Sequence, residues 1–153
     1  MYNENWPRWV FASISQYFYD NRQGIEFLVE GQVHNKTEFK DTMELRIDGP
    51  YATEISKDYW KLYSEVNVLL TSKMDLDLYR IHRNTGIVAA IFTPLQIFKY
   101  GTGPGDDQSL LGCMTLLQEY RNTIQISHFG QIEPNVELLQ ATVEGHYNLF
   151  LSV

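Results

Sequence analysis

The first run of hydrophobic residues has helical spacing. Val10, Phe11, Ile14, Tyr17 and Phe18 recur at steps of three and four residues, which places them on one side of a helix. A proline at position 7 suits a first helical turn, and a glycine at position 24 suits a helix end. The pattern predicts an amphipathic helix over residues 6–20, whose apolar stripe needs a sheet to cover.

Residues 25–33 and 43–48 follow as strand candidates. In the second segment, Met43, Leu45 and Ile47 alternate with charged residues, as in a strand with one buried face. The Gly49-Pro50 pair is typical of a turn, so it predicts that this strand ends there.

Residues 59–71 form the strongest predicted strand of the first half. A strand of this length spans about 40 Å, which is long for a small domain. One face is apolar except for Ser64, and the other face is polar and aromatic. The apolar face comprises Trp60, Leu62, Val66, Val68 and Leu70, and the other face comprises Tyr59, Lys61, Tyr63, Glu65 and Asn67.

Residues 75–92 fit two structures. Leu78, Ile81, Thr85, Val88 and Phe92 step by three and four residues, as on one side of a helix. The competing interpretation is a hairpin with its turn at residues 84–86 and a return strand over residues 87–92. The paired alanines at positions 89 and 90 favour the helix.

The last third is predicted to be rich in strands. Residues 95–100, 110–117, 122–129 and 138–153 are the candidates. Residues 110–117 are almost all apolar, which is typical of a strand buried on both faces, whereas residues 138–153 alternate cleanly. Together the elements predict one α+β domain over residues 1–153. Its sheet is expected to be mostly antiparallel, with an N-terminal amphipathic helix and a second helix packed on the sheet.

Composition and charge narrow the possible functions. The 153 residues include 14% aromatics and one cysteine, which excludes an intrachain disulfide and a multi-cysteine zinc site. Acidic residues outnumber basic ones by 19 to 12, and residues 100–153 hold six acids and one base. This charge opposes nucleic-acid binding, and fits either a solvated acidic face or a wall past which DNA slides.

Signal-peptide features and long apolar runs are lacking, so we expect a protein made in a cytosol.

Four features of the sequence are candidates for chemical function. Glu144 and His146 share the polar face of the last strand, where a pair could hold a metal or move a proton, but a metal site needs three or four ligands. His128 shares a face with two isoleucines and is expected to be half-buried and hydrogen-bonded. Cys113 lies in the most apolar strand, which predicts a buried, inert thiol. The glycine-rich segment 101–107 lacks a phosphate-binding motif and is expected to be a mobile acidic loop. No catalytic constellation emerges, so a non-enzymatic protein without cofactors is predicted.

The layout resembles a known family. A helix over residues 6–20 precedes a long strand that opens with Asp58-Tyr59-Trp60 and continues through Glu65-Val66-Asn67-Val68. A helix across the sheet and a long alternating strand over residues 141–151 complete it. This order resembles the tail-terminator and neck-completion proteins of long-tailed bacteriophages, although residues 101–131 are longer and richer in strands than that layout.

The resemblance implies a virion protein that forms a homo-oligomeric ring, usually of six subunits. Such a ring joins the tail tube to the head-closure ring, and DNA passes through its centre without specific binding. The partners implied are other copies of this chain and the neighbouring neck and tail-tube proteins, with no membrane. Candidates for the lumen from the sequence pattern are Asp106, Asp107, Glu133 and Glu144. Candidates for subunit contacts are Tyr59, Trp60 and Tyr63, together with Trp6 and Trp9, which are expected to be exposed.

Two alternatives remain open at this point. One is a small α+β enzyme or ligand-binding domain with a pocket around Glu144, His146 and His128. The other is a monomeric adaptor that binds a single protein partner.

Overall fold

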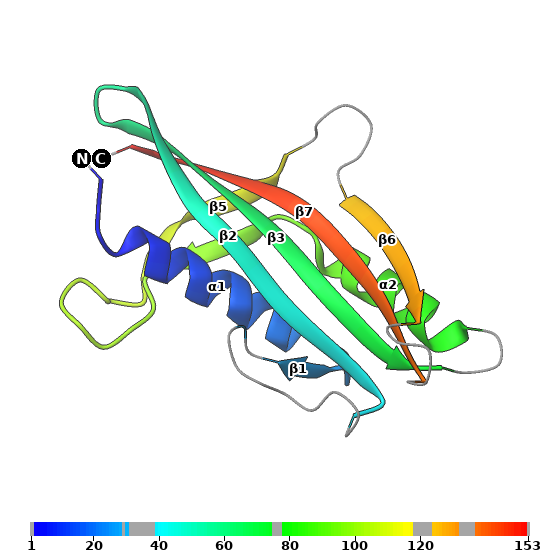
Figure 1. The fold of residues 1–153 in the computed structure, drawn as a ribbon. Coiled ribbons are helices and arrows are strands. Elements are labelled where there is room, and N and C mark those ends of the chain that lie inside the picture. The colour runs from blue at the N-terminus through cyan, green and yellow to red at the C-terminus, as the bar shows by residue number, and fades with distance from the viewer. Residues whose placement is uncertain are drawn as a thin grey trace.

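Seven strands and two helices make up the computed structural model, which describes residues 2–28, 30, 39–74, 78–117, 124–131 and 137–152 (Figure 1). In chain order the elements are α1 (Trp6–Asp20), β1 (Glu26–Leu28), β2 (Asp41–Ser56), β3 (Tyr59–Lys73), α2 (Tyr79–Ile91), β4 (Leu95–Phe98), β5 (Leu110–Leu116), β6 (Ile124–Gln131) and β7 (Leu138–Ser152).

Three long strands, β2, β3 and β7, form the centre of the sheet and run antiparallel to one another. The short β1 pairs in parallel with the start of β2, so the sheet is mixed. The free edge of β7 is divided between two antiparallel partners, with β6 along its first half and β5 at Asn148 and Tyr147. β4 in turn pairs with β5, which curls this end of the sheet (Figure 1). The predicted α+β class is confirmed. The sheet differs from the predicted, mostly antiparallel one, because it is mixed and curled.

Both helices cover the same face of the sheet. Val10, Ile14 and Phe18 of α1 and Val88 of α2 are completely buried, in one hydrophobic core with the apolar side chains of β3 and β7. The opposite face of β2, β3 and β7 is not covered by either helix, and its side chains are mostly partly exposed. The alternation of these strands therefore separates a hydrophobic core from an open, polar face.

The helix interpretation of residues 75–92 is confirmed over Tyr79–Ile91, and the hairpin alternative is excluded there. Ile81, Thr85 and Val88 are buried as the spacing predicts. Asn84 is also buried, and its amide donates hydrogen bonds to Asp41 and Ser72 on β2 and β3. Asparagine is also common in turns, which the hairpin alternative required, but here the Asn84 side chain joins the helix to the sheet.

The predicted break at Gly49-Pro50 is wrong, because β2 continues to Ser56. The pairing of β2 with β3 is irregular between Asp48 and Tyr51 and then resumes. Among the described strands, none pairs with the outer edge of β2 beyond Glu44. Proline's missing N–H therefore removes no ladder bond at this edge, and its presence does not end the strand.

The prediction that residues 110–117 are buried on both faces is also wrong. Met114 is the buried residue of β5, and Cys113 is exposed. β5 lies toward the curled margin of the sheet, where it pairs with β7 at only two positions. A run of apolar residues does not show whether a strand lies at the centre of a sheet or near its edge, because the position of a strand depends on which strands it pairs with.

Of the two helices, neither α1 nor α2 has the length and hydrophobicity required to cross a membrane within the described residues.

Candidate functional site

A polar cluster lies on the open face, at the middle of the two central strands. It comprises Tyr63 and Glu65 of β3 and Glu144 and His146 of β7, and is called here the open-face cluster. Glu65 lies directly opposite His146 in the β3–β7 register. Tyr63 and Glu144 are each two residues away along their strands, and so they point to the same face.

The four side chains are within contact distance of one another. The Tyr63 hydroxyl lies 2.5 Å from His146 Nδ1 and 3.1 Å from Glu65 Oε1. His146 Nδ1 is 3.8 Å from Glu65 Oε1, and His146 Nε2 is 3.6 Å from Glu144 Oε1. The side chains of Glu65, Glu144 and His146 are each between 32% and 39% exposed, so the cluster is open to solvent on one side.

The sequence predicted part of this cluster. Glu144 and His146 do share a polar face, as the alternation of the last strand indicated. No local pattern connects Glu65 with them, because the register that brings them together joins strands far apart in the chain. Its position on the polar face of residues 59–71 was a signal, but only the strand pairing shows which residue it meets.

The predicted pocket around Glu144, His146 and His128 is wrong. His128 pairs with the buried Ala141, so it points to the helix side of the sheet, away from the open face. There its ring lies 4.5 Å from the ring of His82 on α2. Burial, together with the neighbouring His82, lowers the pKa of His128. His128 is nonetheless exposed, where a half-buried, hydrogen-bonded side chain was expected.

Two surface hollows in the described part of the chain lie along α1. One is lined by Tyr2, Trp6, Lys99 and Leu110, and another by Tyr17 and Pro94 among others. No member of the open-face cluster lines either hollow.

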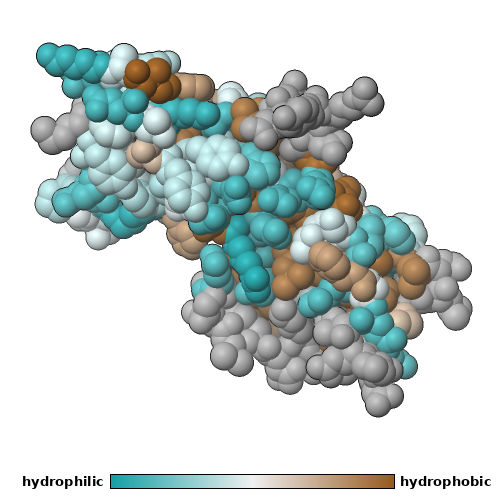
Figure 2. All heavy atoms as spheres, turned by 45° about the horizontal axis from the view of Figure 1, so that its top comes forward, coloured by the Kyte–Doolittle hydropathy of each residue, from teal (hydrophilic) through white to brown (hydrophobic). Residues whose placement is uncertain are grey.

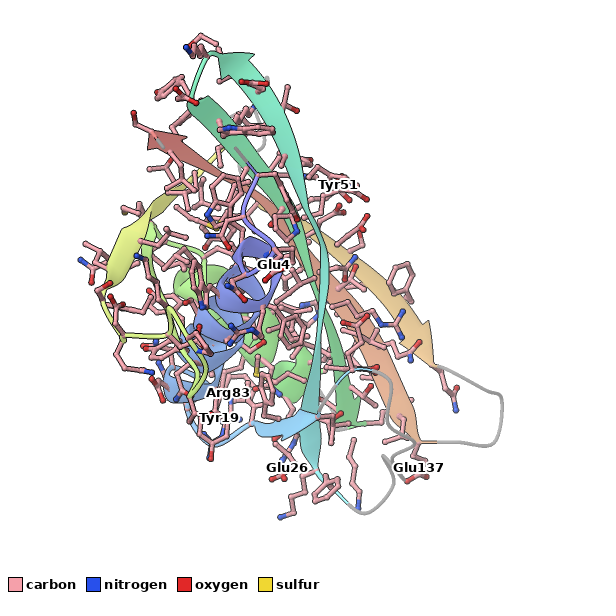
Figure 3. All side chains as sticks on the ribbon, turned by 90° about the vertical axis from the view of Figure 1, so that its left-hand side faces the viewer. Glu4, Tyr19, Glu26, Tyr51, Arg83 and Glu137 are labelled. Carbon is pink, nitrogen blue, oxygen red and sulfur yellow. The ribbon has the colours of Figure 1, made fainter. Side chains whose placement is uncertain are left out.

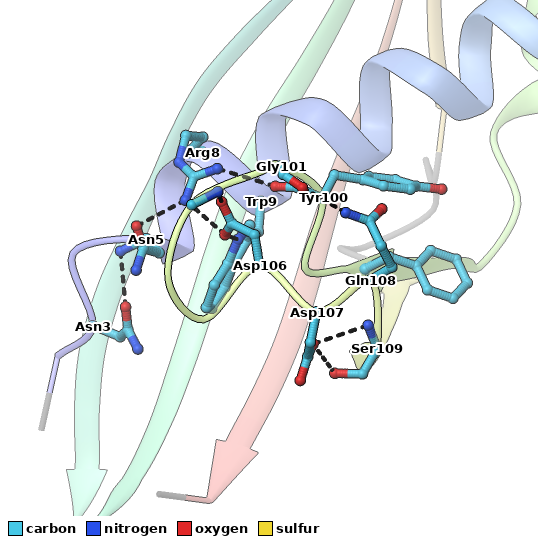
Figure 4. A network of polar contacts seen from close by, with 12 residues as sticks. Asn3, Asn5, Arg8, Trp9, Tyr100, Gly101, Asp106, Asp107, Gln108 and Ser109 are labelled. Atoms are coloured by element: carbon cyan, nitrogen blue, oxygen red, sulfur yellow. Dashed lines mark hydrogen bonds and ion pairs between the residues drawn. The ribbon is translucent and has the colours of Figure 1, made fainter.

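Asp106, a lumen candidate, is tied to α1 and does not face open solvent (Figure 4). Its side chain is 1% exposed. It accepts hydrogen bonds from Arg8 Nη2 at 2.8 Å, Trp9 Nε1 at 2.6 Å and the Gly103 amide at 3.1 Å. The hydrogen bond from Arg8 is the main cause that lowers the pKa of Asp106 to about 2.

The same network fixes the loop that was expected to be a mobile acidic segment. Arg8 donates to the Tyr100 carbonyl, and Gln108 donates to the Gly101 carbonyl (Figure 4). A side chain at Gly101 would collide with Asp106 and Arg8, and the φ of Gly101 is +141°, so this position requires glycine. Gly101 therefore allows a close approach between the loop and the helix.

The other lumen candidates differ in their surroundings. Asp107 is exposed and accepts hydrogen bonds from Ser109, which lowers its pKa. Glu144 belongs to the open-face cluster, and Glu133 lies outside the described residues.

The tryptophans predicted for exposed subunit contacts are core residues. Trp6 and Trp9 are each 3% exposed. Trp6 packs edge-on against Tyr2 and Trp60, so the aromatic N-terminus closes the end of the core. The prediction that Trp6 and Trp9 are exposed is wrong, because the apolar stripe of α1 extends through its first turn.

Exposed aromatic residues do occur at one end of the molecule. The hairpin end is defined here as residues 51–60 of β2 and β3 together with residues 150–152 of β7. Tyr51, Ile55, Tyr59 and Phe150 are exposed there, and the rings of Tyr59 and Phe150 are stacked. Tyr51 points away from α1, on the open side of the sheet (Figure 3).

In comparisons with known proteins, the chain matches no family model, and no curated protein is significantly similar to it.

Proposed function

We propose that this chain is a non-enzymatic structural protein of the bacteriophage neck or tail-terminator type, which closes into a homo-oligomeric ring. The observation that carries the proposal is the hairpin end. All residues from 53 to 59 are exposed, and the hairpin projects past the start of α1 (Figure 1). A projecting strand pair with exposed aromatic side chains suits contact with a neighbouring subunit.

An unpaired strand edge supports the same proposal. Beyond Glu44, the outer edge of β2 has no partner among the described strands. Long edges of this kind pair readily with a strand of another chain. A head-to-tail contact of the β2 edge and hairpin end with another part of the next copy would generate a closed ring if the rotation closes.

The character of the surface favours a contact of mixed polarity. In the view of Figure 2, hydrophilic and hydrophobic side chains are interspersed rather than gathered into one continuous hydrophobic face. Interfaces between separately folded subunits have this composition, with tyrosine enriched at their centres. Of the lumen candidates, Asp107 and Glu144 keep at least part of their side chains exposed.

The solution mass of the purified protein, measured by light scattering on a sizing column, tests the proposal. We expect about six times the 17.9 kDa of one chain, with rings in negative-stain images. Ile55→Asp places a charge at the hairpin end and is expected to return the ring to monomers. Phe129→Asp is the matched control, because Phe129 is also exposed but lies on β6.

A strictly monomeric wild-type protein at high concentration would overturn the proposed self-assembly. Equal loss of the ring in Ile55→Asp and Phe129→Asp would contradict the assignment of the contact to the hairpin end.

A further inference from the structure

We propose that Glu65, Glu144 and His146 form a binding site for a divalent transition-metal ion, specifically Zn²⁺, and that Tyr63 positions the imidazole. This inference concerns the open face of the sheet and goes beyond the proposed ring, since one subunit supplies all of the protein ligands.

The donor set suits zinc. Two carboxylates and one imidazole are ligand types that Zn²⁺ takes, and three protein ligands leave a further position for water or another group. One ligand atom from each residue lies within 4.8 Å of the others. Ligand atoms around a tetrahedral zinc lie about 3.3 Å apart for bonds of about 2.0–2.1 Å. The 3.6 Å between His146 Nε2 and Glu144 Oε1 needs little adjustment to reach that spacing.

The hydrogen bonds of Tyr63 select the imidazole nitrogen that can bind the ion. A phenol has one proton, and Tyr63 donates it to Glu65 Oε1. With that proton used, the contact between the Tyr63 oxygen and His146 Nδ1 is a hydrogen bond in the tautomer whose ring proton is on Nδ1, and this tautomer leaves Nε2 for the ion.

In this tautomer Nε2 carries the lone pair of the ring, and Glu144 Oε1 lies 3.6 Å from it. Two electron-rich atoms at this distance repel each other, and a cation bound to both removes that repulsion. Holding one imidazole nitrogen by a hydrogen bond while the other binds the ion is the usual arrangement at metal-binding histidines.

The surrounding charge also attracts a cation. Asp48 lies opposite Glu65 in the β2–β3 register, adding a third carboxylate to this part of the open face. Within the described residues, neither Glu65 nor Glu144 forms an ion pair with a lysine or an arginine, and the partner of both is His146. The cluster therefore has negative charge that an ion could neutralise.

The backbone beneath the site is well placed to hold it. β3 and β7 pair without irregularity over fifteen consecutive positions, from Tyr59 opposite Ser152 to Lys73 opposite Leu138. The residues that follow two of the ligands along the strands, Val66 after Glu65 and Tyr147 after His146, are completely buried on the other face. Ligands on packed central strands lose little freedom when an ion binds, which favours binding.

The experiment is equilibrium dialysis of the full chain against Zn²⁺ after treatment with a chelator, with metal measured per chain. We expect one tightly bound ion in the wild-type protein. Glu65→Gln, Glu144→Gln and His146→Gln should each weaken binding at least tenfold. Tyr63→Phe should weaken it about tenfold, because it removes a hydrogen bond that orients the ligand.

A spectroscopic measurement locates the ion. The ring resonances of His146 should shift on addition of Zn²⁺ in wild-type protein, and this readout does not depend on the folding of any variant. His128→Gln is the matched control and should leave both binding and the His146 shift unchanged, because His82 and His128 meet on the opposite side of the sheet.

Absence of a stoichiometric ion from the wild-type protein would overturn the proposal. So would unchanged His146 resonances, or binding that survives in His146→Gln and disappears in His128→Gln. Light scattering of the same samples shows separately whether the ring forms, so failure of the metal site and failure of the ring are distinguishable.

Discussion

Asp106 connects a surface loop to the first helix through a single carboxylate. One oxygen accepts from Arg8 and Trp9, and the other accepts from the Gly103 amide. An ionised carboxylate makes stronger hydrogen bonds than a neutral group, so the network depends on the charge of Asp106. Since the folded protein lowers the pKa of Asp106 to about 2, its ionisation and folding are linked.

Replacing Asp106 with asparagine should lower the melting temperature by a few degrees at neutral pH. The stabilisation from Asp106 is present above the ordinary carboxyl pKa of 3.8 and is lost as the pH falls from there through about 2. The difference between wild type and Asp106→Asn should therefore narrow over that range. Thermal unfolding at several pH values, followed by circular dichroism, measures it.

Asp107→Asn is the control for this prediction, because Asp107 is exposed and accepts hydrogen bonds only from its near neighbour Ser109 among the contacts described. An equal loss of stability in the two variants would contradict a special role for Asp106.

Gly145 marks a close approach between β7 and the end of α2. A Cβ at this position would lie 2.5 Å from the ring of Phe92. That ring is held between Phe18 and Tyr147, and it is 3% exposed. Gly145→Ala should therefore destabilise the protein by about 1–3 kcal/mol, as other overpacked cores do.

Gly112→Ala provides the comparison in urea unfolding. A Cβ there would lie 2.6 Å from the end of the Leu149 side chain, which can move more easily than a held ring. A smaller loss of stability is expected for Gly112→Ala, and a larger loss than in Gly145→Ala would show that Phe92 has room to move.

At the scale of elements, α2 is fastened to the sheet by polar contacts as well as by its apolar side. Asn84 donates to Asp41 at 2.8 Å and to Ser72 at 3.0 Å, and Arg80 lies 3.2 Å from Asp41. Asp41 begins β2 and Ser72 is near the end of β3, so one amide joins three elements.

Asn84→Ala should lower the free energy of unfolding by about 1–3 kcal/mol, because it leaves buried polar groups without their partner. Arg83→Ala, on the exposed side of the same helix and 3.9 Å from Asp41, should cost about 1 kcal/mol or less. Urea unfolding of the two variants tests this difference. A cost for Asn84→Ala as small as that expected for Arg83→Ala would mean that the attachment of α2 rests on its apolar side chains.

The elements that the sequence predicted best are those with one buried face. The alternation of residues 138–153 and 59–71 matched β7 and β3 closely, and the spacing of Val10, Ile14 and Phe18 matched α1. Each pattern there reflects a local period that tertiary structure preserves. Where the outcome depended on neighbouring strands, as at Pro50 and in β5, the same reasoning failed.

The open-face cluster was predictable only in part for a related reason. Glu144 and His146 lie on one strand, so their spacing alone puts them together. Glu65 and Tyr63 join them through the register of β3 with β7, which no local pattern contains. The prediction that Trp6 and Trp9 are exposed failed for a different reason, since abundant tryptophan fits an interface and a core equally well.

The whole molecule is asymmetric, with both helices on one face of a sheet whose longest strands extend past the core (Figure 1). In β3, alternate residues from Leu62 to Leu70 are buried, while every residue from 53 to 59 at the hairpin end is exposed. The pair β2 and β3 therefore contributes to the hydrophobic core at one end and is exposed for contacts with another molecule at the other end.

Hydrogen exchange along these strands should show the same division. In dilute protein, amides of residues 64–70 should exchange most slowly, because opening them requires loss of the core. Amides of residues 53–59 should exchange quickly in dilute protein and slow as the concentration is raised, because the proposed ring covers the hairpin end.

Mass spectrometry of exchanged peptides at low and high protein concentration measures both effects. Slowing confined to the hairpin end, and absent in Ile55→Asp, would link the exposed aromatic residues to assembly. If the solution mass rises while residues 53–59 exchange equally fast at both concentrations, the subunits meet through another surface. The projecting strands would then need a different partner, such as a neighbouring protein of the same assembly.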